Sequence, residues 1–190
     1  MMDNYLTNPI IFIVITIVSF LQFMFILRFL FEIVRVNYHN PVCQFVVRVT
    51  NPIIVPLRII PLSIGRFDII IISLLVLITA FKIYFPFYFT SFDYSINSLL
   101  IASFGKAIQE VLDVLWYVVI IGAIGSWFVA HNSHPIFILI DELCEPFYRP
   151  IRKALPSVSG IDFSPIILLA LIHLLQLIIV PPIFNLSRYF

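Results

Sequence analysis

Charged residues are scarce in this chain of 190 residues. Asp, Glu, Lys and Arg make up 11% of it, whereas a water-soluble domain carries about 25%. Because so few charges cannot coat the surface of a folded chain of this size, the composition excludes a water-soluble protein. The net charge of +1 also lacks the clustered basic excess that phosphate binding requires, which excludes nucleic acid as a direct partner.

Cysteine is scarce as well. The chain has 2 cysteines, Cys43 and Cys144, which form no CxxC pair and are too few for a disulfide framework or a thiolate metal site. No segment resembles a nucleophile elbow, a phosphate-binding loop or a zinc-protease helix. The sequence therefore predicts no catalytic residue, no metal site, no cofactor and no enzymatic activity.

Long hydrophobic runs are what the chain does contain, since 62% of its residues are hydrophobic and its mean hydropathy is +1.10. A spanning helix needs about 20 mostly apolar residues. Four windows qualify, and they are residues 4–27, 69–89, 114–130 and 163–187. The third window is short, so we expect its helix to extend back through Leu112, with Asp113 near its entrance. We expect Pro181 and Pro182 to end the last helix. The predicted fold class is an all-α integral membrane protein with about four transmembrane helices.

The basic residues indicate the orientation of these spans. The connections between spans one and two and between spans three and four hold eight of the 11 Lys and Arg residues, namely Arg28, Arg35, Arg48, Arg58, Arg66, Arg149, Arg152 and Lys153. Short cytoplasmic connections are enriched in Lys and Arg. We therefore expect both connections to be cytoplasmic and both termini to face the opposite side. A re-entrant element near residues 94–104 would preserve this parity.

An internal repeat becomes visible when the chain is compared with itself at an offset of 94 residues. Without a gap, Pro41 falls on Pro135, Pro52 on Pro146, Pro56 on Pro150, Arg58 on Arg152 and Asp68 on Asp162. The repeated unit is a span, a basic connection and a second span. Because each unit crosses twice, the two copies point the same way and form parallel repeats. The predicted repeats are residues 1–93 and 94–190.

Each connection contains a polar edge on an otherwise apolar stretch, as in Gln44, Arg48 and Asn51. This pattern predicts an amphipathic helix lying in the membrane interface, one in each repeat. Proline lacks a backbone donor and disfavours helical dihedral angles in the residue before it. We therefore expect the paired prolines to break these helices, at Pro52 and Pro56 and at Pro146 and Pro150.

The two connections share a motif, Asn-Pro-x-x-x-Pro-Leu-Arg from Asn51 and Glu-Pro-x-x-x-Pro-Ile-Arg from Glu145. Together with Gly-Ile-Asp-Phe-Ser-Pro at 160–165, these motifs resemble the YggT family of bacterial inner-membrane proteins, over nearly the whole chain. The first copy departs from the family pattern at 65–69, where it reads Gly-Arg-Phe-Asp-Ile. A role specific to the second turn is therefore not necessarily shared by the first.

The resemblance implies a multi-pass protein of the cell inner membrane. In that membrane the basic connections, expected to be cytoplasmic, predict periplasmic termini. Family members are associated with envelope and division processes, with osmotic or ion homeostasis and, in plastids, with cytochrome assembly and nucleoid distribution. The resemblance implies no enzymatic activity. The two-copy length is similar to that of the proteobacterial form of the family.

Two Arg and Asp pairs stand out in the repeated motif. Asp68 and Asp162 precede spans two and four, where a carboxylate accepts from unpaired helix N–H groups. Arg58 and Arg152 either hold anionic lipid headgroups, pair with these carboxylates or contact a protein partner. Arg149 and Lys153 lie beside Arg152 and form the densest basic cluster in the chain, which suits the anionic cytoplasmic leaflet.

Polar residues inside the spans form the second group of candidates, since intramembrane ionisable groups are costly. They are Lys82, His173 and Gln176. For His173 we expect a hydrogen bond to Thr79 or Gln22 on another span, with a functional role as the alternative. Lys106, Glu110 and Asp113 either precede a late-starting third span, which the short apolar window favours, or face an interior polar cavity.

Two functions remain open on this basis. The first is a non-enzymatic scaffold or assembly factor that acts through its basic connections on the lipid bilayer, on other membrane proteins or on a second copy. The second is an ion or osmolyte channel formed by oligomerisation, lined by His173, Lys82, Glu110 and Asp113. A scaffold should tolerate His173→Leu and fail with Arg58→Ala and Arg152→Ala, whereas a channel should show the reverse.

Overall fold

Six helices make up almost all of the described structure. The computed structural model describes residues 3–58, 63–64, 67–88, 95–128, 134–155 and 162–189. The helices are α1 (Asp3–Val34), α2 (Pro41–Leu57), α3 (Ile69–Tyr88), α4 (Ile96–Phe128), α5 (Pro135–Ala154) and α6 (Ser164–Ser187). Two strands of two residues each, β1 (Ser63–Ile64) and β2 (Phe67–Asp68), pair antiparallel just before α3. The predicted all-α membrane fold is confirmed.

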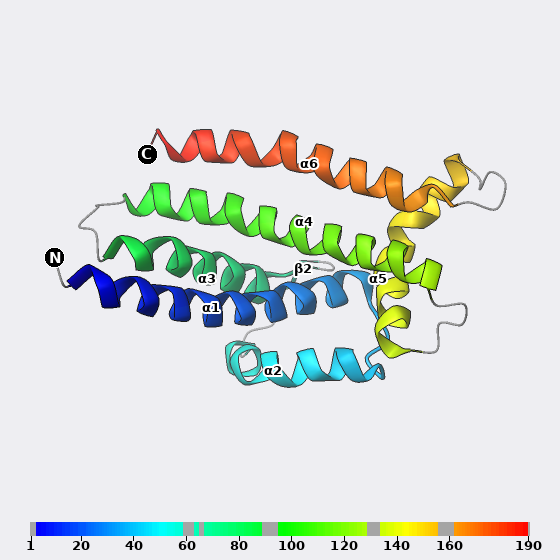
Figure 1. The fold of residues 1–190 in the computed structure, drawn as a ribbon, viewed down its shortest axis with the longest axis horizontal. Coiled ribbons are helices and arrows are strands. Elements are labelled where there is room, and N and C mark those ends of the chain that lie inside the picture. Colours follow the sequence, from blue (N-terminus) through cyan, green and yellow to red (C-terminus); the bar gives the residue numbers. More distant parts are fainter. Residues whose placement is uncertain are drawn as a thin grey trace.

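Four of these helices are long and apolar enough to cross a membrane. The spanning segments are Pro9–Val34, Ile69–Phe87, Ile96–Ser126 and Ser164–Ser187. The start of α1, the end of α3, the start of α4 and the end of α6 lie at one end of the molecule (Figure 1). Large apolar side chains on their outward faces are exposed, including Phe12, Leu77, Tyr117 and Leu177. Such faces require a hydrocarbon solvent.

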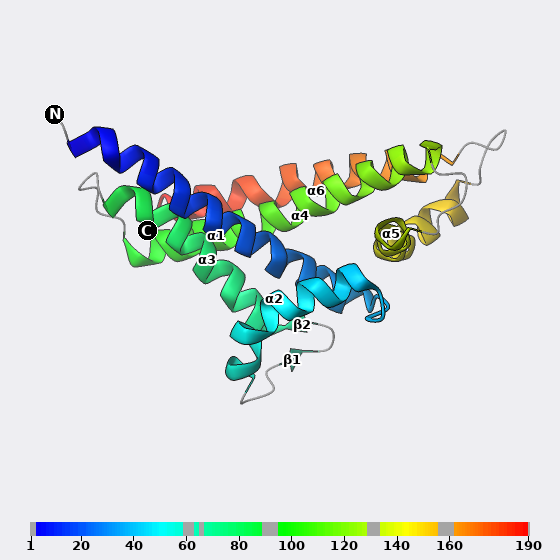
Figure 2. The same cartoon turned by 60° about the horizontal axis from the view of Figure 1, so that its bottom comes forward.

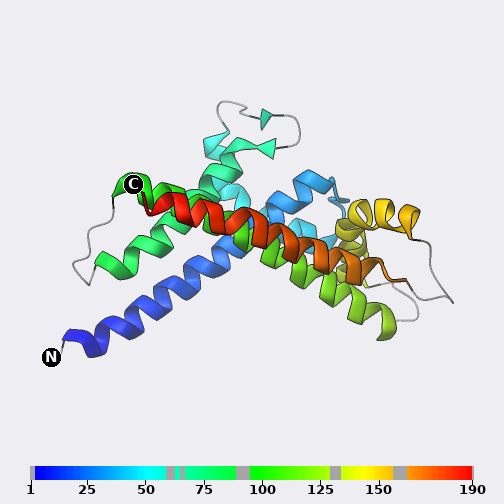
Figure 3. The same cartoon turned by 90° about the horizontal axis from the view of Figure 1, so that it is seen from above.

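The two remaining helices connect the spans within each half. Helix α2 packs against α1, and α5 packs across α4 near the end opposite to the termini (Figures 1 and 2). Seen from above, α1 crosses the α6 direction at a wide angle, so the spans do not form a parallel bundle (Figure 3). The side chain of Asn40, which caps α2, donates to the backbone carbonyl of Pro135 at 2.6 Å and ties the two connecting helices together.

The offset of 94 residues relates all three helices of the first half to those of the second. Helices α2 and α5 begin at Pro41 and Pro135, and α1 and α4 are 32 and 33 residues long. Each half is therefore a span, a connecting helix and a span. The predicted boundary between residues 93 and 94 lies outside the described residues.

The third span is longer than the sequence predicted. Helix α4 is continuous from Ile96, so the expected start near Leu112 is wrong, and residues 96–104 belong to this helix rather than to a separate re-entrant element. The reason is that the charges of its first half are paired or half-buried between helices, where they do not stop a helix from spanning. The repeat contains evidence for this longer span, because Lys106, Glu110 and Asp113 align with uncharged residues inside α1.

The paired prolines do not break the connecting helices. Pro52 and Pro56 lie inside α2, and Pro146 and Pro150 lie inside α5. Within each pair the prolines are four residues apart, so the missing donors fall on the same helix face, and all four prolines are exposed. The carbonyls left without a partner can therefore bond to water or headgroups, which lowers the cost of proline in a helix.

Helix α6 also continues past its proline pair, because Pro181 and Pro182 lie inside it and it ends at Ser187. Beyond the prolines, Ile183 packs so closely on Gly105 of α4 that a Cβ atom there would lie 2.8 Å from its side chain. Packing against α4 thus holds the last turns of α6 in place, as neighbouring helices do for proline-containing spans.

Candidate functional site

A polar network joins three spans in the interior of the molecule. Gln22 of α1 donates to the Thr79 hydroxyl at 2.7 Å and accepts from the Lys82 ammonium at 2.8 Å. Lys82 also forms an ion pair with Glu110 of α4, with 2.9 Å between Nζ and Oε1. Gln22 and Thr79 are fully buried, and the Lys82 and Glu110 side chains are each 17% exposed. The network therefore links α1, α3 and α4 in a region of low dielectric constant.

A cavity of about 160 Å³ lies beside this network. Its walls include the side chains of Ser19, Gln22, Lys82, Glu110 and Asp113. The second carboxylate oxygen of Glu110 is buried and has no hydrogen-bond partner among the described residues. The cavity has room for a water molecule beside these polar side chains, while Phe23, Ile26 and Val114 make the rest of its wall apolar.

A second contact reaches α4 from α6. The Gln176 amide donates to Asp113 Oδ1 at 2.7 Å. Gln176 and Lys82 are equivalent at the 94-residue offset, so the two repeats place a donor at the same position, and each donor contacts a carboxylate of α4. The prediction that the charges of α4 precede the span is wrong, and the alternative, an interior polar site, is the one that the structure shows.

His173 lies apart from this site. Its side chain is on the exposed face of α6, and its expected partners Gln22 and Thr79 bond to one another. The predicted hydrogen bond from His173 is therefore wrong. At the 94-residue offset His173 is equivalent to Thr79, so one position of the repeat faces the interior in α3 and the outside in α6.

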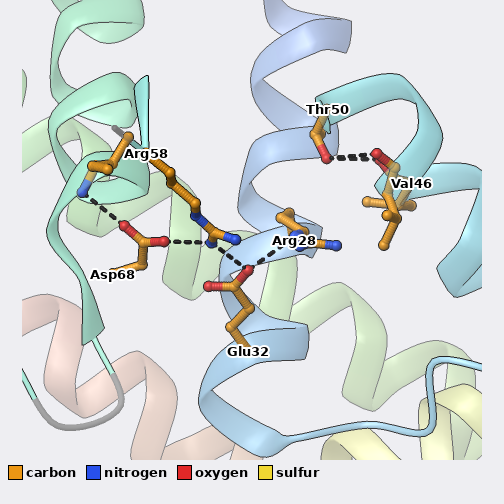
Figure 4. A network of polar contacts seen from close by, with 8 residues as sticks. Arg28, Glu32, Val46, Thr50, Arg58 and Asp68 are labelled. Atoms are coloured by element: carbon orange, nitrogen blue, oxygen red, sulfur yellow. Dashed lines mark hydrogen bonds and ion pairs between the residues drawn. The ribbon is translucent and has the colours of Figure 1, made fainter. Parts of the chain in front are cut away.

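Arg58 lies at the centre of an ionic cluster in the first repeat, the boundary cluster, which also contains Arg28, Glu32 and Asp68 (Figure 4). Its guanidinium bonds to Asp68 and, at 2.8 Å, to Glu32 of α1, which also pairs with Arg28 at 3.0 Å. Asp68 in turn accepts from the backbone N–H of Ile70 at 2.9 Å. The cluster thus fixes the end of α2 to α1 and to the start of α3.

The second repeat contains an equivalent cluster around Arg152. Its guanidinium bonds to Asp162 and to Glu145, each at 2.8 Å, and it lies 5.1 Å from the centre of the Tyr148 ring. Asp162 accepts from the backbone N–H of Ser164 at 2.9 Å. The predicted role of both Asp residues at the helix starts is confirmed, and the structure shows the alternative in which the Arg and Asp residues pair.

The other basic candidates lie on the surface. Arg149 is 69% exposed and its Nε is 3.8 Å from Glu145, a distance that gives a weak ion pair. Lys153 is exposed in the last turn of α5. Contact of these residues with anionic lipid or with a protein partner stays a prediction.

Neither cysteine forms a disulfide. Cys43 and Cys144 are free and buried, and burial raises the pKa of the Cys144 thiol to about 11, so this thiol is protonated at neutral pH. Within the described ranges, no group of three His, Cys, Asp or Glu side chains is placed to hold a metal ion.

We expect Arg58→Ala to destabilise the protein by about 1 kcal/mol, because it leaves Asp68 and Glu32 without their shared cation. The side chain of Arg58 is 35% exposed, so solvent screening keeps this loss small. Thermal unfolding in detergent measures it. Arg48→Ala, which removes an exposed arginine of α2, the helix that Arg58 follows, is the matched control, and an equal loss in both variants would contradict the clustering role of Arg58.

The pH dependence of stability should include a contribution from Asp162. Burial alone would raise the pKa of its carboxyl, but hydrogen bonds from Ser164 and the Arg152 guanidinium outweigh burial and lower it. The stabilisation is present above the unfolded pKa of about 3.9 and is lost as the pH falls through the lower folded pKa. Melting temperatures at about pH 6 should therefore differ between the wild type and Asp162→Asn, and this difference should shrink below about pH 3.5. A constant difference would contradict the assignment.

Comparison with known proteins places the chain among its relatives. The CCB3/YggT family matches residues 7–88 and 101–183, two segments that begin 94 residues apart. The uncharacterised protein YggT of Escherichia coli K12 is 30% identical over 90% of this chain and 88% of its own length. Uncharacterised proteins of Pseudomonas aeruginosa and Haemophilus influenzae are 31% and 33% identical over 92% and 85% of this chain, and over 90% and 86% of their own lengths. No solved structure matches. With both repeats matched over nearly their full length, the chain belongs to the CCB3/YggT family.

Proposed function

We propose that the protein is a non-enzymatic scaffold or assembly factor of the bacterial inner membrane. The observation that carries this proposal is the bonding of polar side chains on one span to polar side chains on another. Lys82 pairs with Glu110, and Gln176 bonds to Asp113. In this arrangement the polar groups hold spans together, as interhelical polar contacts do in membrane bundles.

The surface available to partners lies on the connecting helices. Arg48 on α2 and Arg149 and Lys153 on α5 are exposed, and the basic connections favour a cytoplasmic location for both helices, with periplasmic termini. The proposed contacts are anionic headgroups of the inner leaflet and other membrane proteins.

An oligomeric channel is the second candidate, and one observation favours it. The cavity beside Lys82 is also lined by Glu110 and Asp113, so three charged side chains of the spans lie around one opening. His173 on the outer face of α6 would then lie where a second copy completes the pathway.

Flux measurements separate the two functions. The purified protein is reconstituted into liposomes and assayed for K⁺ and H⁺ flux, beside empty liposomes as the control. A scaffold gives no flux above the control, and His173→Leu then supports growth in cells that depend on the protein. Steady flux that is abolished by His173→Leu would overturn the scaffold proposal.

A further inference from the structure

One difference between the two repeats concerns the size of the side chains on the long helices that begin them. At the 94-residue offset Arg28 is equivalent to Gly122, Phe29 to Ala123 and Glu32 to Ser126. In the first repeat the Arg28 side chain is buried and bonds to Glu32. The second repeat has only small residues at these three positions.

The small residues leave a cavity of about 410 Å³ between α4, α5 and the start of α6. Gly122, Ala123 and Ser126 form part of its wall. The first repeat fills the equivalent positions with its own large side chains, among them a guanidinium. The second repeat therefore contains a space where the first contains a cation from its own chain.

The charge of the cavity favours a cationic ligand. Asp141 and Asp162 carry its carboxylates, and Arg152 carries its guanidinium. The guanidinium of Arg152 already bonds to Asp162 and, outside the cavity wall, to Glu145. The charged side chains of the wall itself are two carboxylates and one guanidinium, a balance that attracts an ammonium group more than an anion.

The cavity also has an apolar side. Ile140, Pro165 and Ile166 belong to its wall, and Ile166 is 64% exposed on the outer face of α6. The wall therefore runs from charged groups to a surface that faces hydrocarbon. A ligand that matches both ends of the wall has a cationic head and apolar chains. Because membrane lipid surrounds the outer face of α6, a lipid is the ligand class that reaches this cavity.

We propose that this cavity binds the headgroup of an aminophospholipid, whose primary ammonium pairs with the carboxylates of Asp141 and Asp162 and takes the place that the Arg28 guanidinium occupies in the first repeat. The ligand class differs from the anionic lipids proposed for the exposed basic residues of α5. This inference holds for a scaffold and for a channel alike.

Lipid retention in native mass spectrometry tests the proposal. The full chain in mild detergent is offered equal amounts of phosphatidylethanolamine, phosphatidylcholine and phosphatidylglycerol. We expect phosphatidylethanolamine to be retained about ten-fold more than either other lipid, because choline has no N–H donor and glycerol no positive charge. Asp141→Asn should lower this retention about ten-fold through loss of a charge-assisted hydrogen bond. Ala123→Phe, which installs the residue of the first repeat, should abolish it.

Glu142→Gln is the matched control, since it removes the neighbouring carboxylate, which bonds to the Asn37 backbone outside the cavity at 2.8 Å. The Glu142→Gln variant should retain as much phosphatidylethanolamine as the wild type. Equal losses in Asp141→Asn and Glu142→Gln, or stronger retention of phosphatidylglycerol, would overturn the proposal. A photo-crosslinker at Ala123 in native membranes should give an adduct with the mass of a lipid, and an adduct with a protein would instead assign the cavity to a basic segment of a partner.

Discussion

Lys82→Met is expected to destabilise the folded protein by about 3 kcal/mol, the largest effect of any single substitution discussed above. The substitution leaves the Glu110 carboxylate, which is 17% exposed, without its cation and removes the donor to Gln22. Breaking a buried ion pair from one side costs about 3–5 kcal/mol, because the remaining charge is uncompensated. Unfolding in mixed micelles, followed by circular dichroism, measures the loss.

Lys106→Met provides the control for this prediction. Lys106 lies one helical turn before Glu110 but bonds to Gln109 of its own helix at 3.2 Å, so its removal leaves no buried charge unpaired. We expect a loss of about 0.5 kcal/mol. Similar losses of stability in both variants would contradict a specific stabilising role of the Lys82–Glu110 ion pair.

The double variant Lys82→Met with Glu110→Leu tests whether the two groups act as a pair. Replacing both charges with apolar groups removes the desolvation cost together with the attraction, so the double variant should lose only about 1 kcal/mol. Additive losses would contradict the view that the pair ties α3 to α4, and they would weaken the scaffold proposal that rests on it.

The sequence could predict the fold because its strongest signals are local or repeated. Apolar windows define three of the four spans, and the offset of 94 residues relates α1, α2 and α3 to α4, α5 and α6. The start of α4 does not follow from hydropathy, because Glu110 and Asp113 lower it although both are bonded across helices. Hydropathy measures the cost of a lone charge, whereas a charge paired across helices costs much less to bury.

The boundary clusters were only partly predictable. Arg58 and Asp68, like Arg152 and Asp162, are ten residues apart in the sequence, so their pairing is one of the contacts that the repeated motif predicts. The motif does not predict the second carboxylate that each arginine contacts. This carboxylate is Glu32 of α1 in the first repeat and Glu145 of α5 in the second. The two sources are not equivalent, and the contact depends on how the helices rotate and cross.

The polar network of the spans depends on tertiary packing in the same way. Its bonds join residues far apart in the sequence, such as Gln22 and Lys82. The sequence shows that both residues are polar and lie in spans, but it does not show which face of each helix meets the other. His173 illustrates this limit, because its equivalent Thr79 is buried and bonded.

The second large effect is expected from Gly125→Leu, which should destabilise the protein by about 2 kcal/mol and displace α5 from α4. A Cβ atom at Gly125 would overlap the Phe137 ring of α5, and one at Gly122 would lie 2.7 Å from Ile140. The two glycines therefore allow α5 to approach α4 closely. Overpacking of a close contact costs about 1–3 kcal/mol, because neighbouring side chains and backbone must shift.

A second substitution should restore part of this loss. Phe137→Ala removes the ring that the new side chain meets, so the double variant should be more stable than the sum of the two single losses predicts. Ile124→Leu, at a neighbouring and exposed position of α4, is the control and should change stability by less than about 0.5 kcal/mol. Because α5 carries Asp141 and Arg152, its displacement should also abolish retention of phosphatidylethanolamine. Unchanged stability together with unchanged lipid retention in Gly125→Leu would contradict both the close docking of α5 and the cavity that this docking forms.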